Sequence, residues 1–170
     1  MDLSALLKDY ATYNYWANEQ MVGWLRQQNP ELLDREMASS FPTLRHTLLH
    51  IWTAEDIWLN RLKGHSPTRI LYTEFAGDLD ALFAGLLHQS SLFRDFLQQQ
   101  EAAFFDQANT YTHSSGTTFT HRHTEMVLHC LQHSTYHRGQ LVTMARHFGI
   151  GAVPHTDYLV YVRHNRASVV

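Results

Sequence analysis

The sequence has 170 residues, with 13 Lys and Arg against 16 Asp and Glu, which gives a formal net charge of -3 at pH 7. A chain of about this length buries enough surface for one core, so we expect a single domain over residues 1–170. The balanced charge argues against a nucleic-acid partner, and the lack of any uncharged apolar segment of about 18 residues argues against a membrane partner.

Four stretches place apolar side chains at steps of three and four residues, the spacing of amphipathic helices. They cover about residues 2–28, 42–63, 78–100 and 123–147. Asn29-Pro30 ends the first stretch, and Gly149 closes the last one as a left-handed cap. The pattern predicts an all-α four-helix bundle.

Two further segments have patterns of their own. Residues 108–120 alternate β-forming side chains around Ser115-Gly116, which predicts a short β-hairpin insert before the fourth helix. The tail over residues 152–163 contains Pro154 and the apolar run 158–162, and we expect it to pack back on the bundle.

The compartment is predicted from cysteine usage and from the first residues. Cys130 is the only cysteine, so no intramolecular disulfide can form, as is usual in a reducing compartment. The opening MDLSALLKDY lacks the basic and apolar regions of an export signal. We therefore expect a cytoplasmic protein.

Histidine is the unusual part of the composition, with 13 in 170 residues. Neutral imidazole is the commonest side-chain ligand for metals, but scattered surface histidines would give the same count. The spacing of the histidines is therefore what distinguishes a site.

The fourth predicted helix contains His129, His133 and His137, each four residues apart on one face. His129 and His137 lie about 12 Å apart along the axis, too far to bind one ion together, so one adjacent pair must be chosen. On a helical wheel His133 and His137 fall inside the apolar stripe and His129 falls at its edge. The wheel favours His133 and His137.

A third ligand is expected from a facing helix, as in other metal sites built inside bundles. The second helix offers His46 and His50, and His50 lies nearer the centre of its apolar face. Histidines that simply pack in the core would give the same pattern, so both interpretations remain open on spacing alone.

Glu55 also falls within the apolar stripe of the second helix, an unusual place for a carboxylate. It is a candidate catalytic residue, either as a base or by orienting a ligand imidazole. The alternative is an ion pair or hydrogen bond with Arg138 or with the first helix.

Three segments resemble the DinB/YfiT-like family of metalloenzymes. They are HTLLHIWTAEDIW at 46–58, LHCLQHSTYHRGQL at 128–141 and PHTDYLVYVR at 154–163. The HxxxHRGQ run is the specific part of the likeness, which covers nearly the whole chain in order. The resemblance places metal ligands at His50, His133 and His137, in agreement with the wheel.

The resemblance also implies a crossed connection order in the bundle, a homodimer and one divalent metal ion. Zinc and nickel are the expected metals, with manganese, iron or cobalt as further candidates. Some relatives are transferases or isomerases that use low-molecular-weight thiols such as bacillithiol or mycothiol. The additional histidines His46 and His129 leave open a four-histidine site, which would favour a structural or storage role.

Three histidines leave a metal position open to water or substrate, as in catalytic sites. We therefore interpret the protein as a metalloenzyme that activates a small thiol for transfer to an electrophile, with a small molecule as substrate. The alternatives are a metal-dependent hydrolase and a non-catalytic metal-binding stress-response protein.

Overall fold

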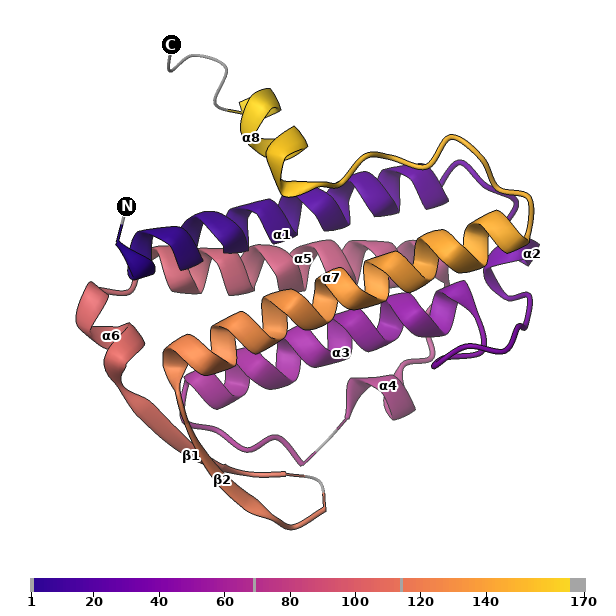
Figure 1. The fold of residues 1–170 in the computed structure, drawn as a ribbon. Helices are drawn as coiled ribbons and strands as arrows, with labels where there is room; N and C mark the ends of the chain where they lie inside the picture. Colours follow the sequence, from indigo (N-terminus) through magenta and orange to yellow (C-terminus); the bar gives the residue numbers. More distant parts are fainter. Residues whose placement is uncertain (1, 69, 114, 166–170) are drawn as a thin grey trace.

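A computed structural model of the protein describes residues 2–68, 70–113 and 115–165. Four long helices form its body, in agreement with the four predicted stretches (Figure 1). They are α1 (Leu3–Leu25), α3 (Leu44–Leu62), α5 (Leu79–Gln98) and α7 (His123–His147). In the part of the chain that the structure describes, none of the helices has the length and apolar character needed to cross a bilayer.

Side-chain caps decide where three of these helices begin. Asp2 accepts a hydrogen bond from the Ala5 amide, and Asp78 accepts one from the Ala81 amide in the same way. Thr43 caps α3, which therefore begins two residues later than the predicted start at residue 42. Each cap satisfies an amide that has no partner inside the helix.

Shorter elements lie between the long helices and after the last of them. They are α2 (Pro30–Leu33), α4 (Leu71–Glu74), α6 (Ala102–Asp106), β1 (Ala108–Thr112), β2 (Thr118–Arg122) and α8 (Tyr158–Asn165). β1 and β2 pair antiparallel, from Ala108 opposite Arg122 to Thr112 opposite Thr118. The predicted hairpin insert is confirmed, and its second strand continues two residues further, directly into α7.

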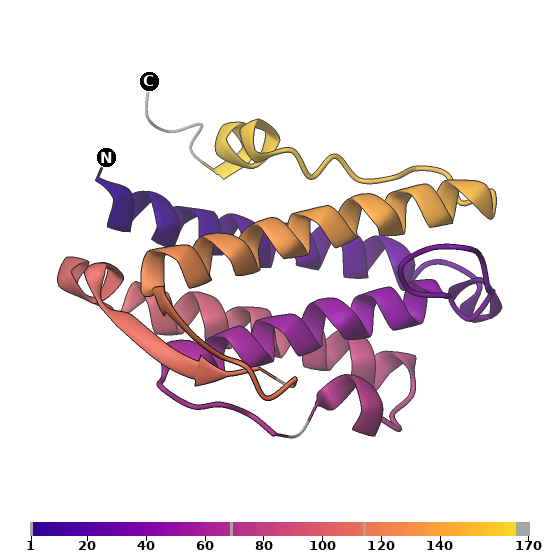
Figure 2. The ribbon, with the colours of Figure 1, turned by 60° about the horizontal axis from the view of Figure 1, so that its bottom comes forward.

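The long helices are connected in a crossed order, as expected from the resemblance. α1 packs against α5 and α7, and α3 packs against the same two helices. The consecutive helices α1 and α3 therefore lie diagonally across the bundle (Figures 1 and 2). α3 and α7 run in opposite directions side by side, which makes them the facing pair that the site needs.

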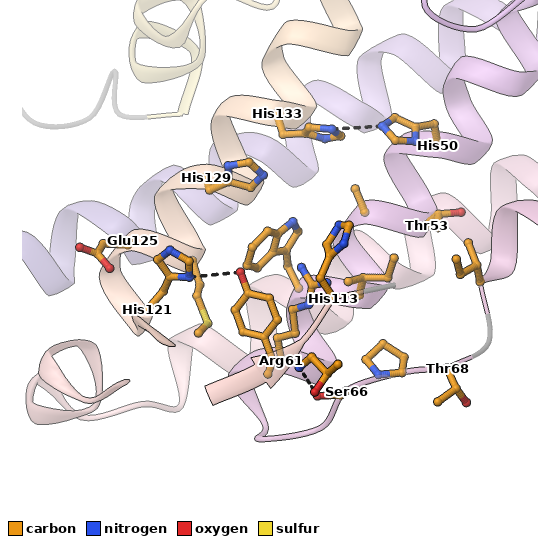
Figure 3. Close-up of a pocket in the computed structure, with 18 of the residues that line it drawn as sticks. His50, Thr53, Arg61, Ser66, Thr68, His113, His121, Glu125, His129 and His133 are labelled. Carbon is orange, nitrogen blue, oxygen red and sulfur yellow. Dashed lines mark hydrogen bonds between the residues drawn. The ribbon is translucent and has the colours of Figure 1, made fainter. Parts of the chain in front are cut away.

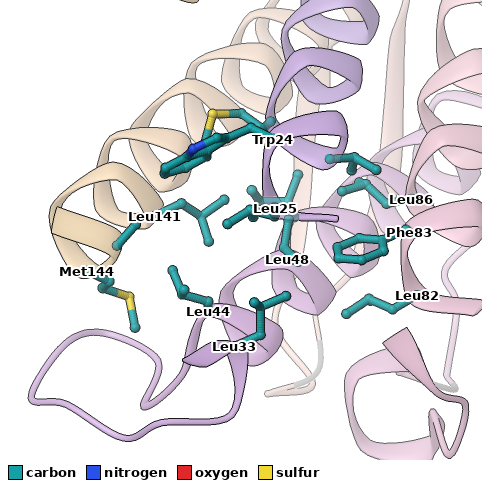
Figure 4. Close-up of a cluster of buried hydrophobic side chains, with 14 of the residues drawn as sticks. Trp24, Leu25, Leu33, Leu44, Leu48, Leu82, Phe83, Leu86, Leu141 and Met144 are labelled. Atoms are coloured by element: carbon teal, nitrogen blue, oxygen red, sulfur yellow. The ribbon is translucent and has the colours of Figure 1, made fainter. Parts of the chain in front are cut away.

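Two apolar clusters fill the bundle, one toward each end. The first is shown in Figure 4 and includes Trp24, Leu25, Leu33, Leu44, Leu48, Leu82, Phe83, Leu86, Leu141 and Met144. The second includes Leu7, Leu59, Phe93, Phe105, Met126 and Leu131. Along each long helix the two clusters are separated by several residues, and these residues include buried polar side chains.

Glu55 is the centre of this polar layer and is fully buried. Its Oε1 atom accepts hydrogen bonds from Asn14 at 2.7 Å, Asn18 at 3.0 Å and Ser134 at 3.2 Å. Its Oε2 atom accepts one from Ser90 at 2.6 Å. The donors come from α1, α5 and α7, so one carboxylate connects all four long helices.

Arg138 carries the positive charge of the same layer and is 3% exposed. Its Nη1 donates to Asn14 Oδ1 at 2.6 Å and to Asn18 Oδ1 at 2.9 Å. Asn14 and Asn18 thus connect the guanidinium to the Glu55 carboxylate. The interpretation of Glu55 as a partner of the first helix is confirmed.

The C-terminal tail packs on α1, as predicted. Tyr161 of α8 is buried against Tyr13 and Ala17. The Tyr13 hydroxyl donates to the Thr156 carbonyl at 2.7 Å. Gly149, which has a φ of +79°, ends α7 and turns the chain toward this tail.

Gly85 of α5 packs so closely on α3 that a Cβ atom there would overlap the indole ring of Trp52. We predict that Gly85→Ala lowers the free energy of unfolding by about 1–3 kcal/mol, since the two helices must separate. Gly23→Ala in α1 is the control, because its added Cβ would have no atom within 4 Å among the described residues other than those of its own helix turn. Helix propensity should make that variant more stable by up to about 1 kcal/mol. Urea denaturation measures both, and a stabilising Gly85→Ala would contradict the close contact.

Candidate metal centre

Three histidines from the facing helices converge on one point. His50 comes from α3, and His133 and His137 come from consecutive turns of α7. The Nε2 atom of His133 lies 3.1 Å from His50 Nε2 and 3.1 Å from His137 Nε2. One ring nitrogen from each histidine lies within 4.8 Å of the others. The structure thus brings together the three histidines that the sequence pattern selected.

These distances suit a shared metal ion. Bonds of about 2.0–2.1 Å in tetrahedral geometry place two nitrogen ligands about 3.3 Å apart. Hydrogen bonds between the rings satisfy the cluster less well, because His133 Nε2 has either one proton or one lone pair, and two ring nitrogens face it at 3.1 Å. A cation bound between the three Nε2 atoms would accept the lone pair of each imidazole and so remove the repulsion between them.

Gln140 orients His137. Its Oε1 atom lies 2.7 Å from His137 Nδ1, while its amide nitrogen donates to Ser40 and Tyr136. Because the amide oxygen only accepts, Nδ1 of His137 carries the proton and Nε2 presents a lone pair to the cluster. This contact was not predicted from the sequence, although the spacing of three residues on one helix indicates that the two side chains can meet.

Phe41 closes one side of the cluster. Its ring centre lies 4.1 Å from that of His50, with the two planes 28° apart, and 5.6 Å from that of His137. Tyr72 of α4 packs behind Phe41 at 5.5 Å. Neither residue was found from the sequence, because both lie outside the long periodic stretches.

The other side opens into a pocket of about 980 Å³. His50 and His133 line this pocket, whereas His137 does not. Figure 3 shows the two histidines together at one end. The long helices form part of the wall, and the hairpin completes it with Tyr111 and His121. A ligand entering here would meet the His50 and His133 side of the cluster.

The two additional histidines lie outside the cluster. His129 packs its ring against Trp58, with ring centroids 4.7 Å apart. His46 Nδ1 lies 2.7 Å from Thr43 Oγ1 at the start of α3. Within the described ranges the group able to hold an ion comprises three histidines, so the geometry does not form the saturated four-histidine arrangement.

Glu55 lies in the polar layer and does not line the pocket. Burial raises the pKa of its carboxyl group, and the hydrogen bonds from Ser90 and Asn14 lower it. Among the described side chains it hydrogen-bonds to no histidine. The structure therefore places Glu55 in the packing of the four helices, apart from the histidine cluster.

Known proteins resemble this chain over nearly its full length. The sequence model of the DinB family matches residues 1–167. The chain is 30% identical to Protein DinB of Bacillus subtilis over 158 residues, which is 88% of this chain and 90% of that protein. It is 23% identical to the uncharacterized protein YizA of the same organism, covering 83% and 87% of the two chains.

Two solved structures share the fold. A DinB-like protein from Bacillus cereus matches with a TM-score of 0.66 and 20% identity, over 85% of this chain and 91% of that one. YfiT from Bacillus subtilis matches with a TM-score of 0.64 and 14% identity, over 85% and 89%. YfiT is described as a probable metal-dependent hydrolase with an unusual four-helix bundle topology.

The clustered histidines are neutral at pH 7. Burial and, to a smaller extent, the neighbouring histidines lower the pKa of His50 to about 4 and that of His133 to about 3. Burial also lowers the pKa of His137, whereas its bond to Gln140 raises it. Neutral imidazole is the form that binds a metal ion.

These pKa values predict that the metal-free protein becomes less stable in mild acid. Below about pH 6.5 the unfolded chain protonates His50 and His133, but the folded protein does not, so the unfolded state binds more protons. The free energy of unfolding should therefore fall as the pH is lowered from about 7 toward 4.

Urea denaturation of chelator-treated protein across this range measures the effect. The double variant His50→Asn, His133→Asn removes both groups and should show a smaller pH dependence. Equal pH dependence in the variant and the wild type would contradict the assignment of these pKa values.

Proposed function

The chain belongs to the DinB family, and from this premise we propose that it is a metalloenzyme that activates a small thiol for transfer to an electrophile. His50, His133 and His137 would hold one divalent metal ion. The observation that carries the proposal is the convergence of three Nε2 atoms at the end of a large pocket.

The donor set suits catalysis. Three neutral imidazoles add no negative charge and leave a coordination position for substrate. Imidazole ligands suit zinc, nickel, iron and copper, and zinc or nickel is our expectation here. When bound, such an ion supplies Lewis acidity that lowers the pKa of a coordinated thiol, so that thiolate is available at neutral pH.

The carboxylates around the cluster are poorly placed to activate water as the nucleophile. Glu125 is the only acidic residue among those described in the pocket wall, and its carboxylate accepts from the Arg122 amide at 2.9 Å. Glu55 is committed to four hydrogen bonds in the core. Attack by water commonly needs a positioned base, whereas a thiol, with an ordinary pKa near 8.5, loses its proton more easily.

The chain itself contributes orientation and exclusion of water. Gln140 holds the His137 ring in one tautomer, and Phe41 covers the cluster on the side away from the pocket. Ile57, Trp58 and Met126 give the pocket apolar surface on which an electrophile can bind. Fewer waters then compete with the thiol for the electrophile.

Metal-dependent hydrolysis is the second candidate. It is favoured by the shared fold of YfiT, the protein described as a probable metal-dependent hydrolase. It would use the same three histidines and the same pocket. The two functions differ in one respect that is easily tested, because only transfer requires an added thiol.

We predict that His50→Ala, His133→Ala and His137→Ala each lose most of the bound metal, since each removes one of three ligands. His46→Ala and His129→Ala are the matched controls and should keep metal near the wild-type amount. Elemental analysis of protein purified without a histidine tag or nickel resin measures this. Wild-type metal content in His137→Ala would refute the ligand set.

We further predict that metal-loaded protein transfers small thiols to electrophiles and that metal-free protein does not. His133→Ala should reduce the rate by at least about a hundredfold while the helical circular dichroism remains unchanged. A panel of thiols paired with a panel of electrophiles, with loss of free thiol as the readout, provides the measurement.

The same panel separates the alternatives. Metal-dependent product formation without any thiol would favour hydrolysis. Identical rates with loaded and metal-free protein across all pairs would refute catalysis at this site and favour a non-catalytic metal-binding role.

A further inference from the structure

Arg61 is a buried cation in the wall of the pocket. It lies near the end of α3 and is 8% exposed. Its guanidinium carbon is 4.6 Å from the centre of the Trp58 ring and 4.1 Å from that of Tyr111. The two rings meet at 80°, so the guanidinium occupies the corner between them.

This guanidinium has no anionic partner in the described parts of the chain. It donates no hydrogen bond to a described residue, and its Nε atom is buried without a partner. Arg138, the other deeply buried guanidinium, contrasts with it because it donates to Asn14 and Asn18. Burial lowers the pKa of Arg61, but arginine stays charged at neutral pH.

A buried charge normally needs an oppositely charged partner, and aromatic rings supply only part of the stabilisation that such a partner gives. Rings cover two sides of the Arg61 group, so its planar N–H donors remain for an acceptor in the pocket. A guanidinium of this kind binds carboxylate or phosphate oxygens in pairs. The missing partner therefore has the chemistry of an oxyanion.

Arg61 and the histidine cluster belong to one pocket but lie at different places in it. Arg61 is eleven residues after His50, about 16 Å along the axis and on the same helix face. Between them the wall is continuous, with His129 4.7 Å from Trp58 and 5.8 Å from His133, measured between ring centres. Figure 3 shows Arg61 further along the pocket from His133, toward Ser66.

We propose that Arg61 selects an elongated substrate by binding a carboxylate or phosphate group at the end remote from the reacting atom. The reacting end then reaches His50 and His133, and the middle of the molecule lies on the apolar wall that includes Ile57 and Trp58. This substrate class rests on the function proposed above, but recognition of the anion by Arg61 does not require the metal.

The first test therefore uses metal-free protein. Hexanoate, hexyl phosphate and hexanol are titrated by NMR, with the Trp58 side-chain N–H as one reporter. We expect at least one of the two anions to bind about ten- to a hundredfold more tightly than hexanol, and the two anions distinguish carboxylate from phosphate recognition.

Arg61→Gln should abolish this preference, and Arg61→Lys, which keeps the charge but not the fork of donors, should retain part of it. Lys63→Gln is the matched control, because it removes the same charge two residues away. Lys63 is exposed, lies outside the pocket and should leave the preference unchanged. Circular dichroism checks the fold, and Arg61→Met, which keeps an apolar stem against both rings, replaces Arg61→Gln if that variant unfolds.

The second test measures the chain length that joins the metal site to Arg61. Cobalt-substituted protein is titrated with mercaptopropionate, mercaptohexanoate and mercaptoundecanoate and with the matching mercaptoalcohols, following the cobalt–sulfur absorption. The advantage of the acid over the alcohol should grow with chain length, because only long chains can span about 16 Å. It should disappear in Arg61→Gln.

The outcomes separate the two proposals. Equal binding of the anions and hexanol in the wild type, or equal loss of the preference in Lys63→Gln and Arg61→Gln, overturns the role of Arg61. Absence of the cobalt–sulfur absorption with every thiol overturns thiol activation. The anion preference in metal-free protein would then still establish Arg61 as the recognition residue.

Discussion

The buried carboxylate of Glu55 is the constraint on which the rest of the structure depends. A buried carboxylate costs several kcal/mol unless donors surround it, and here the donors come from three other helices. The requirement restricts the register of the bundle, because the donors lie at fixed positions on those helices. Ser134 and Arg138 of the polar layer each follow a clustered histidine by one residue. The register that satisfies Glu55 therefore also places His133 and His137 opposite His50.

The same arrangement makes the two sides of the histidine cluster unlike. On one side Phe41 and Gln140 cover the rings and hold one of them in a defined tautomer. On the other side His50 and His133 face a pocket whose wall is largely aromatic and apolar. A catalytic metal site keeps a coordination position open whereas a structural one is closed, so the proposed catalysis depends on this open side. Arg61 makes the two ends of the pocket different, since it places positive charge at the end far from the cluster.

Helical periodicity explains how much of this was predictable from the sequence. A period of 3.6 residues identifies faces, so it located the four helices, the His133–His137 pair and the buried position of Glu55. It carries no information about segments without a period, which is why Phe41 and Tyr72 were missed. It also cannot show which buried group lacks a partner. The isolation of Arg61 became visible only when side chains from α3 and the hairpin were placed together.

The hairpin is attached to the bundle through contacts that do not involve the histidine cluster. Asn109 of β1 donates to the carbonyls of Arg61 and Leu62 at the end of α3, and Thr112 donates to Ser66. The hairpin supplies pocket wall but no clustered histidine. The pocket wall is thus built from two parts, α3 with α7 and the hairpin, and only the first part also carries the clustered histidines. Changes in the strand sequences can therefore alter the shape of the pocket without moving any of the three histidines, as is common where a loop or hairpin lies over a rigid scaffold.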